Sequence, residues 1–346
     1  MWRGWLALAA LFMLAGCGPQ IHRQQAYVFG TLVEITVYGE DEAKARQVTN
    51  QVLKDFDELH ATLHPWEPGT LERINGILAL ATPAAPAKAA MPPGVLPILQ
   101  DATRLSELSE GLFNPAIGNL VRLWGFHSDT FEPRLPDPTA VEKLVQAHPR
   151  MTDLHLEGLT LTATNPAVRV DLGGYAKGYA LDLAAAYLKS QGVSHALINI
   201  GGNVMALGQK GGEPWKVGIQ HPRRAGALAV LALQSGEAIG TSGDYQRFFE
   251  YQGKRYCHLI DPRTGWPADQ AQAVTVIARG PQAGTLSDVA SKPLFVAGPA
   301  DWRRLAARMG VTEVLFVDKD GRVSVTRSLQ QRLSWEDPQP RLTVVE

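Results

Sequence analysis

Apolar and polar residues alternate between Val28 and Tyr38, where Val33, Ile35 and Val37 are separated by polar positions. This period of two predicts a half-buried strand. Between Asp41 and His60 the apolar positions step by three or four instead, which predicts a helix with one buried face. Those positions are Ala45, Val48, Val52, Phe56 and Leu59.

The rest of the chain predicts further helices and short strands. We expect helices over Val95–Glu110, Asp137–Ala147, Ala176–Gln191, near Thr285, and over Asp301–Met309. We expect strands over Leu154–Leu156, Leu159–Ala163, Val168–Leu172, Ala196–Ile200, Trp215–Ile219, Leu228–Leu233, Phe248–Tyr251, Arg255–Ile260 and Ala273–Ala278, with a hairpin turning at Asp320-Gly321 between Val314–Val317 and Val323–Val325. The stretch rich in Pro and Ala is expected to be a loop, Pro83–Pro97. Strands and helices do not alternate regularly, which favours an α+β fold over a doubly wound sheet.

Composition narrows the class of protein. The chain has 346 residues, and 45% of them are hydrophobic, which excludes a disordered chain. Its length suits about two domains or one large one. Basic residues number 33 and acidic residues 34, without long runs of one sign, so we expect no nucleic-acid binding.

The N-terminus has the features of a secretory signal. Arg3 precedes an apolar stretch from Leu6 to Leu14, which is too short to span a membrane. The sequence Leu14-Ala-Gly-Cys17 resembles a lipobox, in which Cys17 is acylated and becomes the mature N-terminus. The alternative is a plain signal peptide cleaved nearby. We therefore expect a signal peptide over 1–16, a tether over 17–25, one domain of two intertwined lobes over 26–335 and a C-terminal tail over 336–346. Such a domain would be tethered outside the cytoplasm.

Generic nucleotide and hydrolase motifs are absent from the sequence, including G-x-G-x-x-G, G-x-x-x-x-G-K-[ST] and G-x-S-x-G. His60 and His64 have the i, i+4 spacing of a zinc pair but lack the glutamate of H-E-x-x-H. Two solvent-facing histidines at a helix end are the favoured interpretation.

Four segments concentrate residues with chemical potential: Asp171–Gly178, Gly202-Asn203, Thr241–Arg247 and His258–Gly265. The first places glycines and Lys177 at a strand-to-helix junction, where backbone N–H groups and a cation suit a phosphate. Each segment also has a structural interpretation as a turn or a helix cap. Asp288, for example, ends a Thr285-Leu-Ser-Asp capping box.

In this order, these segments resemble the FAD:protein FMN transferase family, also called the ApbE flavin transferases. The resemblance covers most of the chain after Cys17. Its motifs are Phe29-Gly-Thr31, Trp66 with Leu71-Glu-Arg-Ile-Asn75, Ser109 to Gly118, Leu123-Trp-Gly-Phe126, Asp171 to Asp182, Gly201-Gly-Asn203, Trp215 to Ile219, Thr241 to Tyr245, His258 to Gly265, and Ser287-Asp288 with Leu294 to Gly298.

The resemblance implies a two-lobed fold with the FAD site between the lobes. It implies an enzyme that splits the pyrophosphate of FAD, attaches FMN to a threonine or serine hydroxyl of a membrane-bound redox protein, and releases AMP with the help of Mg²⁺. Such a lipoprotein would lie on the periplasmic face of a bacterial membrane. The implied flavin contacts are Phe29, Trp66, Leu112, Phe113, Asn114, Asp171, Lys177 and Ile260. The implied metal ligands are Asp288 and the Gly174 carbonyl, with a threonine four residues after Asp288.

Side-chain chemistry agrees with these implied roles. Trp66 can stack on a flavin or adenine ring, and Lys177 can offset pyrophosphate charge. His258 is the candidate general base for the incoming hydroxyl. Asp261 either orients His258 or only starts a turn.

Two positions depart from the family pattern. Lys292 stands where the metal-binding threonine is expected, between Ser291 and Pro293. One hypothesis is that its ammonium fills part of the cation's role; the alternative is that Ser291 supplies the oxygen and Lys292 points at a phosphate. Asn114 replaces an aspartate, which removes a negative charge beside the implied pocket.

Three other functions compete with the transferase. A hydrolase would use the same pocket with water as acceptor, and a non-catalytic flavin-binding lipoprotein would keep the pocket without the reaction. A serine hydrolase would use Ser242, His258 and Asp261, although no nucleophile elbow surrounds Ser242. The sequence does not select one acceptor protein.

Overall fold

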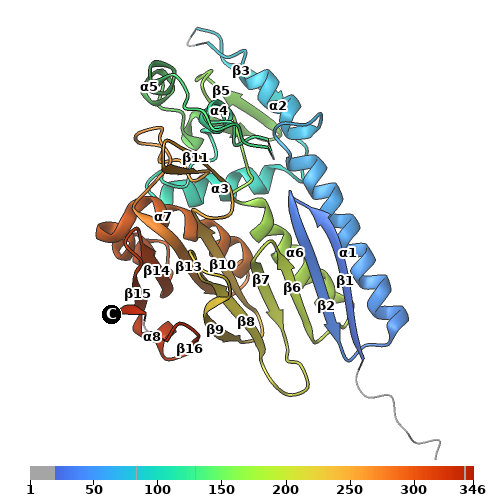
Figure 1. The fold of residues 1–346 in the computed structure, drawn as a ribbon. Helices are drawn as coiled ribbons and strands as arrows, with labels where there is room; N and C mark the ends of the chain where they lie inside the picture. Colours follow the sequence, from blue (N-terminus) through green and yellow to red (C-terminus); the bar gives the residue numbers. More distant parts are fainter. Residues whose placement is uncertain (1–19, 83, 129, 339) are drawn as a thin grey trace, which may run out of the picture.

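A nine-stranded sheet forms the base of the protein in the computed structural model, which describes residues 20–82, 84–128, 130–338 and 340–346 (Figure 1). The strand order is β1-β2-β6-β7-β10-β13-β14-β15-β17, and every neighbouring pair is antiparallel except β15 with β17. The strands are β1 (Ile21–Val28), β2 (Thr31–Tyr38), β6 (Ala196–Ile200), β7 (Asn203–Leu207), β10 (Glu237–Gly243), β13 (Ala271–Arg279), β14 (Glu313–Asp318), β15 (Arg322–Thr326) and β17 (Arg341–Val345). This antiparallel sheet confirms the predicted α+β class.

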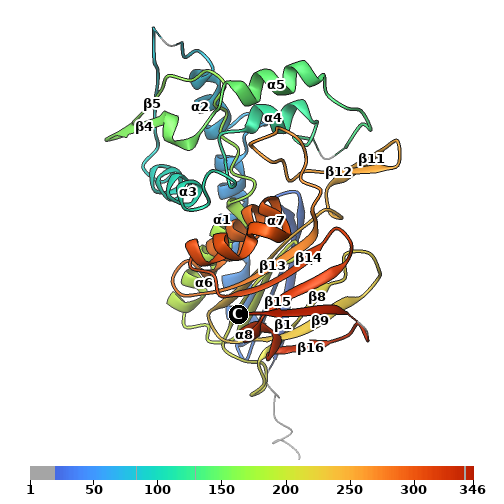
Figure 2. The same ribbon diagram turned by 90° about the vertical axis from the view of Figure 1, so that its left-hand side faces the viewer.

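Both faces of the sheet are covered (Figure 2). One face packs against α1 (Glu42–Leu63), α6 (Ala176–Ser190) and α7 (Ala283–Arg308), and the other against β8 (Trp215–Gln220), β9 (Ala227–Leu233), α8 (Arg327–Gln330) and β16 (Leu333–Trp335). Strand β7 shows the consequence, because Met205 and Leu207 face the helices while Val204 and Ala206 face β8 and β9. Burial on both faces explains why the central strands are mostly apolar and do not alternate with polar residues.

A smaller assembly lies over one end of this base (Figures 1 and 2). The chain enters it twice, between α1 and α6 and again between β10 and β13. It comprises α2 (Thr70–Leu78), β3 (Ala87–Ala90), α3 (Leu96–Leu108), α4 (Gly118–Leu123), α5 (Pro138–Gln146), η1 (Met151–Asp153), β4 (Leu154–Glu157), β5 (Thr160–Ala163), β11 (Phe248–Tyr251) and β12 (Lys254–Cys257). None of the helices in the described part of the chain is both long and apolar enough to cross a membrane.

Helices α1 and α5 begin at the capping residues that the sequence predicts. Asp41 caps α1 by accepting a hydrogen bond from the Lys44 N–H at 2.9 Å, and Asp137 caps α5 in the same way, with Pro138 as its first residue. The two helices expected near Thr285 and after Asp301 form a single kinked element, α7. Its break lies at Gly298, whose φ of 73° is non-helical, beside Pro299.

Several expected elements differ in the structure. Val168–Leu172 is not a strand, because its backbone bonds go elsewhere: the Arg169 N–H donates to the Ala116 carbonyl, and the buried Asn75 amide pairs with both backbone groups of Val170. The expected loop Pro83–Pro97 contains β3, and the strand expected over Arg255–Ile260 ends at Cys257. The strand expected over Val28–Tyr38 is interrupted by a turn at Phe29 and Gly30. The expected tether 17–25 includes the start of β1, and the expected tail 336–346 includes β17.

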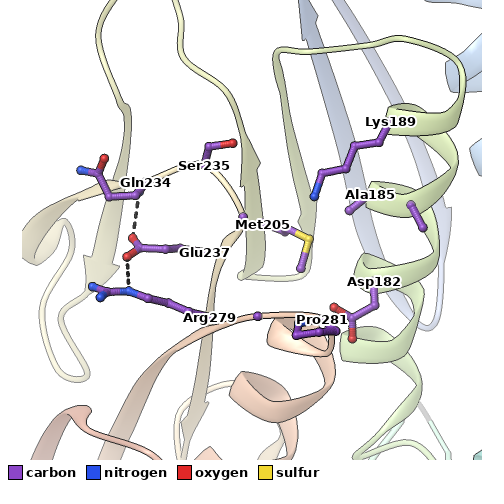
Figure 3. A pocket seen from close by; sticks show the side chains of 12 residues that line it. Asp182, Ala185, Lys189, Met205, Gln234, Ser235, Glu237, Arg279 and Pro281 are labelled. Atoms are coloured by element: carbon purple, nitrogen blue, oxygen red, sulfur yellow. Dashed lines mark hydrogen bonds and ion pairs between the residues drawn. The ribbon is translucent and has the colours of Figure 1, made fainter.

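A cluster of charged side chains joins neighbouring strands of the base. Glu237, only 2% exposed, accepts hydrogen bonds from Arg279 at 2.6 Å and Arg332 at 2.5 Å, and both arginines also pair with Glu313. Glu237 and Arg279 line a hollow of about 700 Å³ that also includes Asp182, Lys189 and Met205 (Figure 3). These ion pairs link β10, β13, β14 and the turn between α8 and β16, which carries Arg332.

Helices α6 and α7 cross at a pair of glycines. A Cβ on Gly178 would lie 2.4 Å from the Gly284 carbonyl oxygen, and a Cβ on Gly284 would lie 2.4 Å from the Gly178 carbonyl oxygen. The Gly178 N–H also donates to the Asp288 carboxylate at 2.8 Å. Only two residues without side chains allow this backbone approach.

We expect Gly178→Ala to lower the free energy of unfolding by about 2 kcal/mol, because the new methyl group must push the two helices apart. The matched control is Gly76→Ala in α2, where a Cβ meets no atom within 4 Å. That change should raise the free energy of unfolding by about 0.5–1 kcal/mol through helix propensity. Urea denaturation followed by tryptophan fluorescence measures both, and equal shifts in the two variants would contradict the close crossing.

Candidate functional site

A cleft of about 810 Å³ lies between the base and the smaller assembly. Its walls come from the β1–β2 turn, the N-terminal end of α6, α7, and loops of the smaller assembly. All eight predicted flavin contacts line this cleft, namely Phe29, Trp66, Leu112, Phe113, Asn114, Asp171, Lys177 and Ile260. His258, Gly174 and Lys292 line it as well, whereas Asp261, Asp288 and Ser291 are not among its lining residues.

The segment before α6 supplies one polar wall. Asp171 accepts a hydrogen bond from the Gly173 N–H at 2.8 Å, and its own N–H donates to the Pro115 carbonyl at 2.8 Å. Burial raises the pKa of the Asp171 carboxyl and lowers the pKa of the Lys177 ammonium, although the Asp288 charge opposes the latter shift. The wall therefore presents a carboxyl group and a cation within one short turn.

Aromatic rings form a second wall. The Arg169 guanidinium lies 4.5 Å from the centre of the Trp66 ring, and His127 lies 5.4 Å from Trp66 between ring centres. Arg169 is held there by donating to the Pro65 carbonyl at 2.6 Å. Trp66 is thus fixed at the cleft as a rigid platform on which a planar ring can stack.

His60 and His64 both line the cleft, which differs from the solvent-facing pair that the sequence favoured. The His64 Nδ1 accepts hydrogen bonds from the backbone N–H groups of Glu67 at 2.9 Å and Trp66 at 3.3 Å. Its role is to form the turn after α1. Among the described residues, no group of three or more His, Cys, Asp or Glu side chains is arranged to hold a metal ion.

His258 enters the cleft with a defined tautomer. Its Nδ1 lies 3.2 Å from the Arg247 carbonyl oxygen, so Nδ1 carries the proton and Nε2 has the free lone pair. Burial, followed by the charges of Arg247 and Lys177, lowers the pKa of His258 to about 3. The imidazole is therefore neutral near pH 7 and can accept a proton.

Asp261 is a turn residue, so the expectation that it orients His258 is not supported. Its carboxylate pairs with the Arg263 guanidinium at 2.7 Å and accepts from the Arg263 N–H at 2.9 Å. Its carbonyl accepts from the Gly265 N–H at 2.8 Å, which closes the turn. The charge of Asp261 is already neutralised by this neighbour.

Lys292 lies directly on Asp288. The ammonium is 2.5 Å from the Asp288 Oδ1 and 2.7 Å from the Asp288 carbonyl oxygen, while Oδ2 accepts from the Gly178 N–H. Burial alone would raise the pKa of the Asp288 carboxyl, but the Lys292 and Lys177 charges outweigh it and lower that pKa. The Lys292 stem passes over Gly174, where an added Cβ would lie 3.0 Å from Cε.

These residues do not fit a divalent cation at Asp288. Mg²⁺ binds oxygen ligands in octahedral geometry at about 2.1 Å, and here an ammonium already occupies the carboxylate oxygen. Ser291 is fully buried, donates to the Asp288 carbonyl at 2.9 Å and pairs with the Ser242 hydroxyl at 2.7 Å. Its oxygen is thus committed inside the fold, and so is Ser242, which removes the serine-hydrolase alternative.

Asn114 has a structural role as well as a place at the cleft. Its side-chain oxygen accepts from the Ala116 N–H at 3.0 Å, and its amide nitrogen donates to the Pro149 carbonyl at 2.8 Å. The amide uses both a donor and an acceptor in this way, which an aspartate could not do.

Sequence reasoning assigned no role to three cleft residues, Arg247, Gln246 and His127. The Arg247 guanidinium donates to the Phe126 and Ser128 carbonyl oxygens at 3.1 and 3.0 Å. It therefore joins segments about 120 residues apart, from Phe126 to Arg247, and no local pattern signals such a contact.

Known proteins share the sequence pattern of this chain. The model of the ApbE family matches residues 29–316. The FAD:protein FMN transferase of Rhodobacter capsulatus is 42% identical over 95% of this chain, although the chain spans only 62% of that relative's length. A Klebsiella pneumoniae protein with the same name is 31% identical over 91% of this chain and 95% of its own.

Solved structures share the architecture. The ApbE protein of Thermotoga maritima superposes with a TM-score of 0.81 at 28% identity, covering 90% of this chain and 99% of its own. The flavinyl transferase ApbE of Pseudomonas stutzeri gives a TM-score of 0.77 at 29% identity, covering 91% and 97%. Sequence and fold therefore agree, and this chain belongs to the ApbE family.

Proposed function

We propose that this protein is an FAD:protein FMN transferase. It takes FAD as donor, transfers FMN to a threonine or serine hydroxyl of another protein as a phosphoester, and releases AMP. The observation that carries the proposal is the cleft, where an aromatic platform, two lysine ammonium groups and a neutral histidine face one space. Membership of the ApbE family supports the same activity.

The cleft suits a dinucleotide with a charged centre. Phe29, Trp66 and Phe113 offer aromatic surface to the flavin or adenine ring, and Lys177 and Lys292 supply positive charge for the pyrophosphate between them. No step is assigned to Mg²⁺, because the Lys292 ammonium already occupies the Asp288 oxygen that would bind it. Phosphoryl transfer of this kind relies mainly on positioning and on charge neutralisation.

His258 moves the proton. The acceptor hydroxyl oxygen attacks the phosphorus on the FMN side while its proton passes to the His258 Nε2. A new phosphorus–oxygen bond forms to the acceptor, and the bond from that phosphorus to the bridging oxygen breaks. The bridging oxygen leaves as part of AMP. The Arg247 carbonyl holds the Nδ1 proton and so keeps Nε2 as the accepting atom.

The partner and location follow from the same proposal. The acceptor is a membrane-bound redox protein, and acylated Cys17 tethers the enzyme to the periplasmic face of the membrane. Cys17 lies outside the described residues. Strand β1 begins at Ile21, four residues after Cys17, and ends at the cleft with Val28.

The first experiment incubates the detergent-solubilised full chain with FAD and an acceptor protein that carries a single candidate threonine. We expect the intact mass of the acceptor to increase by one FMN and AMP to appear in equal amount. A Thr→Val acceptor is the control and should gain no mass. AMP without labelling would indicate the hydrolase, whereas bound, intact FAD would indicate a flavin-binding protein without the reaction; either result would overturn the transferase.

Replacement of His258 tests its role as the general base. We expect His258→Gln to lower the rate of FMN transfer by about 100- to 10,000-fold, the range of general-base catalysis, while FAD binding changes little. Single-turnover transfer and flavin fluorescence measure the two. A variant that transfers FMN at the normal rate would exclude His258 as the base.

The pH dependence follows from the pKa of about 3 in the unliganded cleft. Because His258 stays neutral above that value, protonation of this residue should produce no fall in kcat/KM between about pH 8 and about pH 5. Bound FAD brings negative charge and should raise the pKa of His258, which an NMR titration of its ring protons with and without FAD would detect. A titration near pH 6.5 in the free protein would contradict the cationic environment.

A further inference from the structure

The Lys292–Asp288 pair is unusual in its position. Both residues lie on α7, and the Asp288 side chain is 2% exposed while the Lys292 side chain is 17% exposed at the cleft. An exposed i, i+4 pair contributes little to stability, but this carboxylate is buried. The pair therefore fixes the Lys292 ammonium at the cleft: Nζ donates to two Asp288 oxygens, and the third Asp288 oxygen, Oδ2, accepts from the Gly178 N–H.

The surroundings of this charge also point to an anionic ligand. Lys177, Lys292 and Arg247 all line the cleft, and its lining carboxylates are Glu67 and Asp171. The charges of Arg247, Lys177 and Lys292 each act on His258 in the same direction. Asp288 neutralises only one of the two lysines. These cations therefore gather around His258, where a bound anion would be stabilised.

We propose that the Lys292 ammonium, held on Asp288 and over Gly174, neutralises the pyrophosphate of FAD in the place where a divalent cation would otherwise bind. The inference rests on the proposed transferase activity. Two N–H groups of Lys292 donate to Asp288, and the third donates to a phosphate oxygen, so that the ammonium stabilises charge on the departing AMP. It transfers no proton, so the atoms and charges of the reaction are those already given for His258. Asp288 acts as a positioning residue for Lys292.

This assignment predicts a reaction that needs no metal. With the full chain, we expect the rate of FMN transfer to change less than about twofold when EDTA replaces Mg²⁺. Lys292→Met keeps the stem but removes the charge, and we expect transfer to fall at least about 100-fold with or without Mg²⁺. The loss of one phosphate contact should also weaken FAD binding about tenfold, measured by flavin fluorescence.

Lys292→Thr gives the sharper test. It removes the ammonium, frees the Asp288 Oδ1 and adds a hydroxyl oxygen one helical turn from Asp288. We expect this variant to bind Mg²⁺ in isothermal titration calorimetry, as the parent chain does not, and to transfer FMN at least tenfold faster with Mg²⁺ than with EDTA. Lys216→Thr on the exposed face of β8 is the matched control and should behave as the parent. Thermal unfolding measurements verify that each variant is folded.

Two results would overturn the inference: FMN transfer by the parent chain that collapses in EDTA, or Lys292→Met that retains the parent rate when Mg²⁺ is present. Failure of the proposed function looks different, because the parent chain would then label no acceptor under any condition. In that case FAD binding still decides the role of Lys292. FAD affinity that is independent of Mg²⁺ but lost in Lys292→Met supports the proposed role of Lys292. FAD affinity that requires Mg²⁺ refutes that role.

Discussion

The cleft depends on the close crossing of α6 and α7. Gly178 and Gly284 let the two backbones approach, and the Asp182 carboxylate accepts from the Gly284 and Thr285 N–H groups at 2.8 Å, which fixes the start of α7 against α6. Because α6 begins at the segment that carries Lys177 and α7 carries Lys292, this one contact sets the spacing of the two cations. Helix ends without capping partners could not hold that register.

The sheet explains why the crossing is rigid. Helices cover one face and the sheet of β8, β9 and β16 covers the other, so the central strands are enclosed on both sides. The Glu237 cluster then joins β10, β13 and β14 through ion pairs to a buried carboxylate, and removal of the arginines would leave that charge unpaired in the fold. The smaller assembly shares a hydrophobic core with this base and is also joined to it by polar contacts, among them the Tyr175 hydroxyl, which donates to Asp101 at 2.9 Å.

Local signals in the sequence predicted the longer helices and most strands, because caps, glycines and apolar periods act over a few residues, but they did not predict α2, α4 and α8. The motifs also identified the residues that the fold brings to the cleft, from Phe29 to Lys292. They did not separate site from scaffold. Asp261 lies three residues from His258 but is neutralised by Arg263, and the backbone of Val168–Leu172 pairs with Asn75 and Ala116. The contacts of Val168–Leu172 come from residues distant in sequence, and the Asp261–Arg263 pair is a side-chain contact within a turn; periodicity encodes neither.

The charged groups of the cleft affect one another's protonation. Without an anion, Lys177, Lys292 and Arg247 repel one another, and burial together with these charges keeps His258 neutral. An anionic pyrophosphate relieves that repulsion and makes His258 a stronger base at the moment when a proton must be accepted. Ligand binding and base strength are therefore coupled through the same cations. A divalent ion would add two further positive charges beside Lys292 and would weaken the base, whereas the single ammonium on Asp288 leaves the coupling intact.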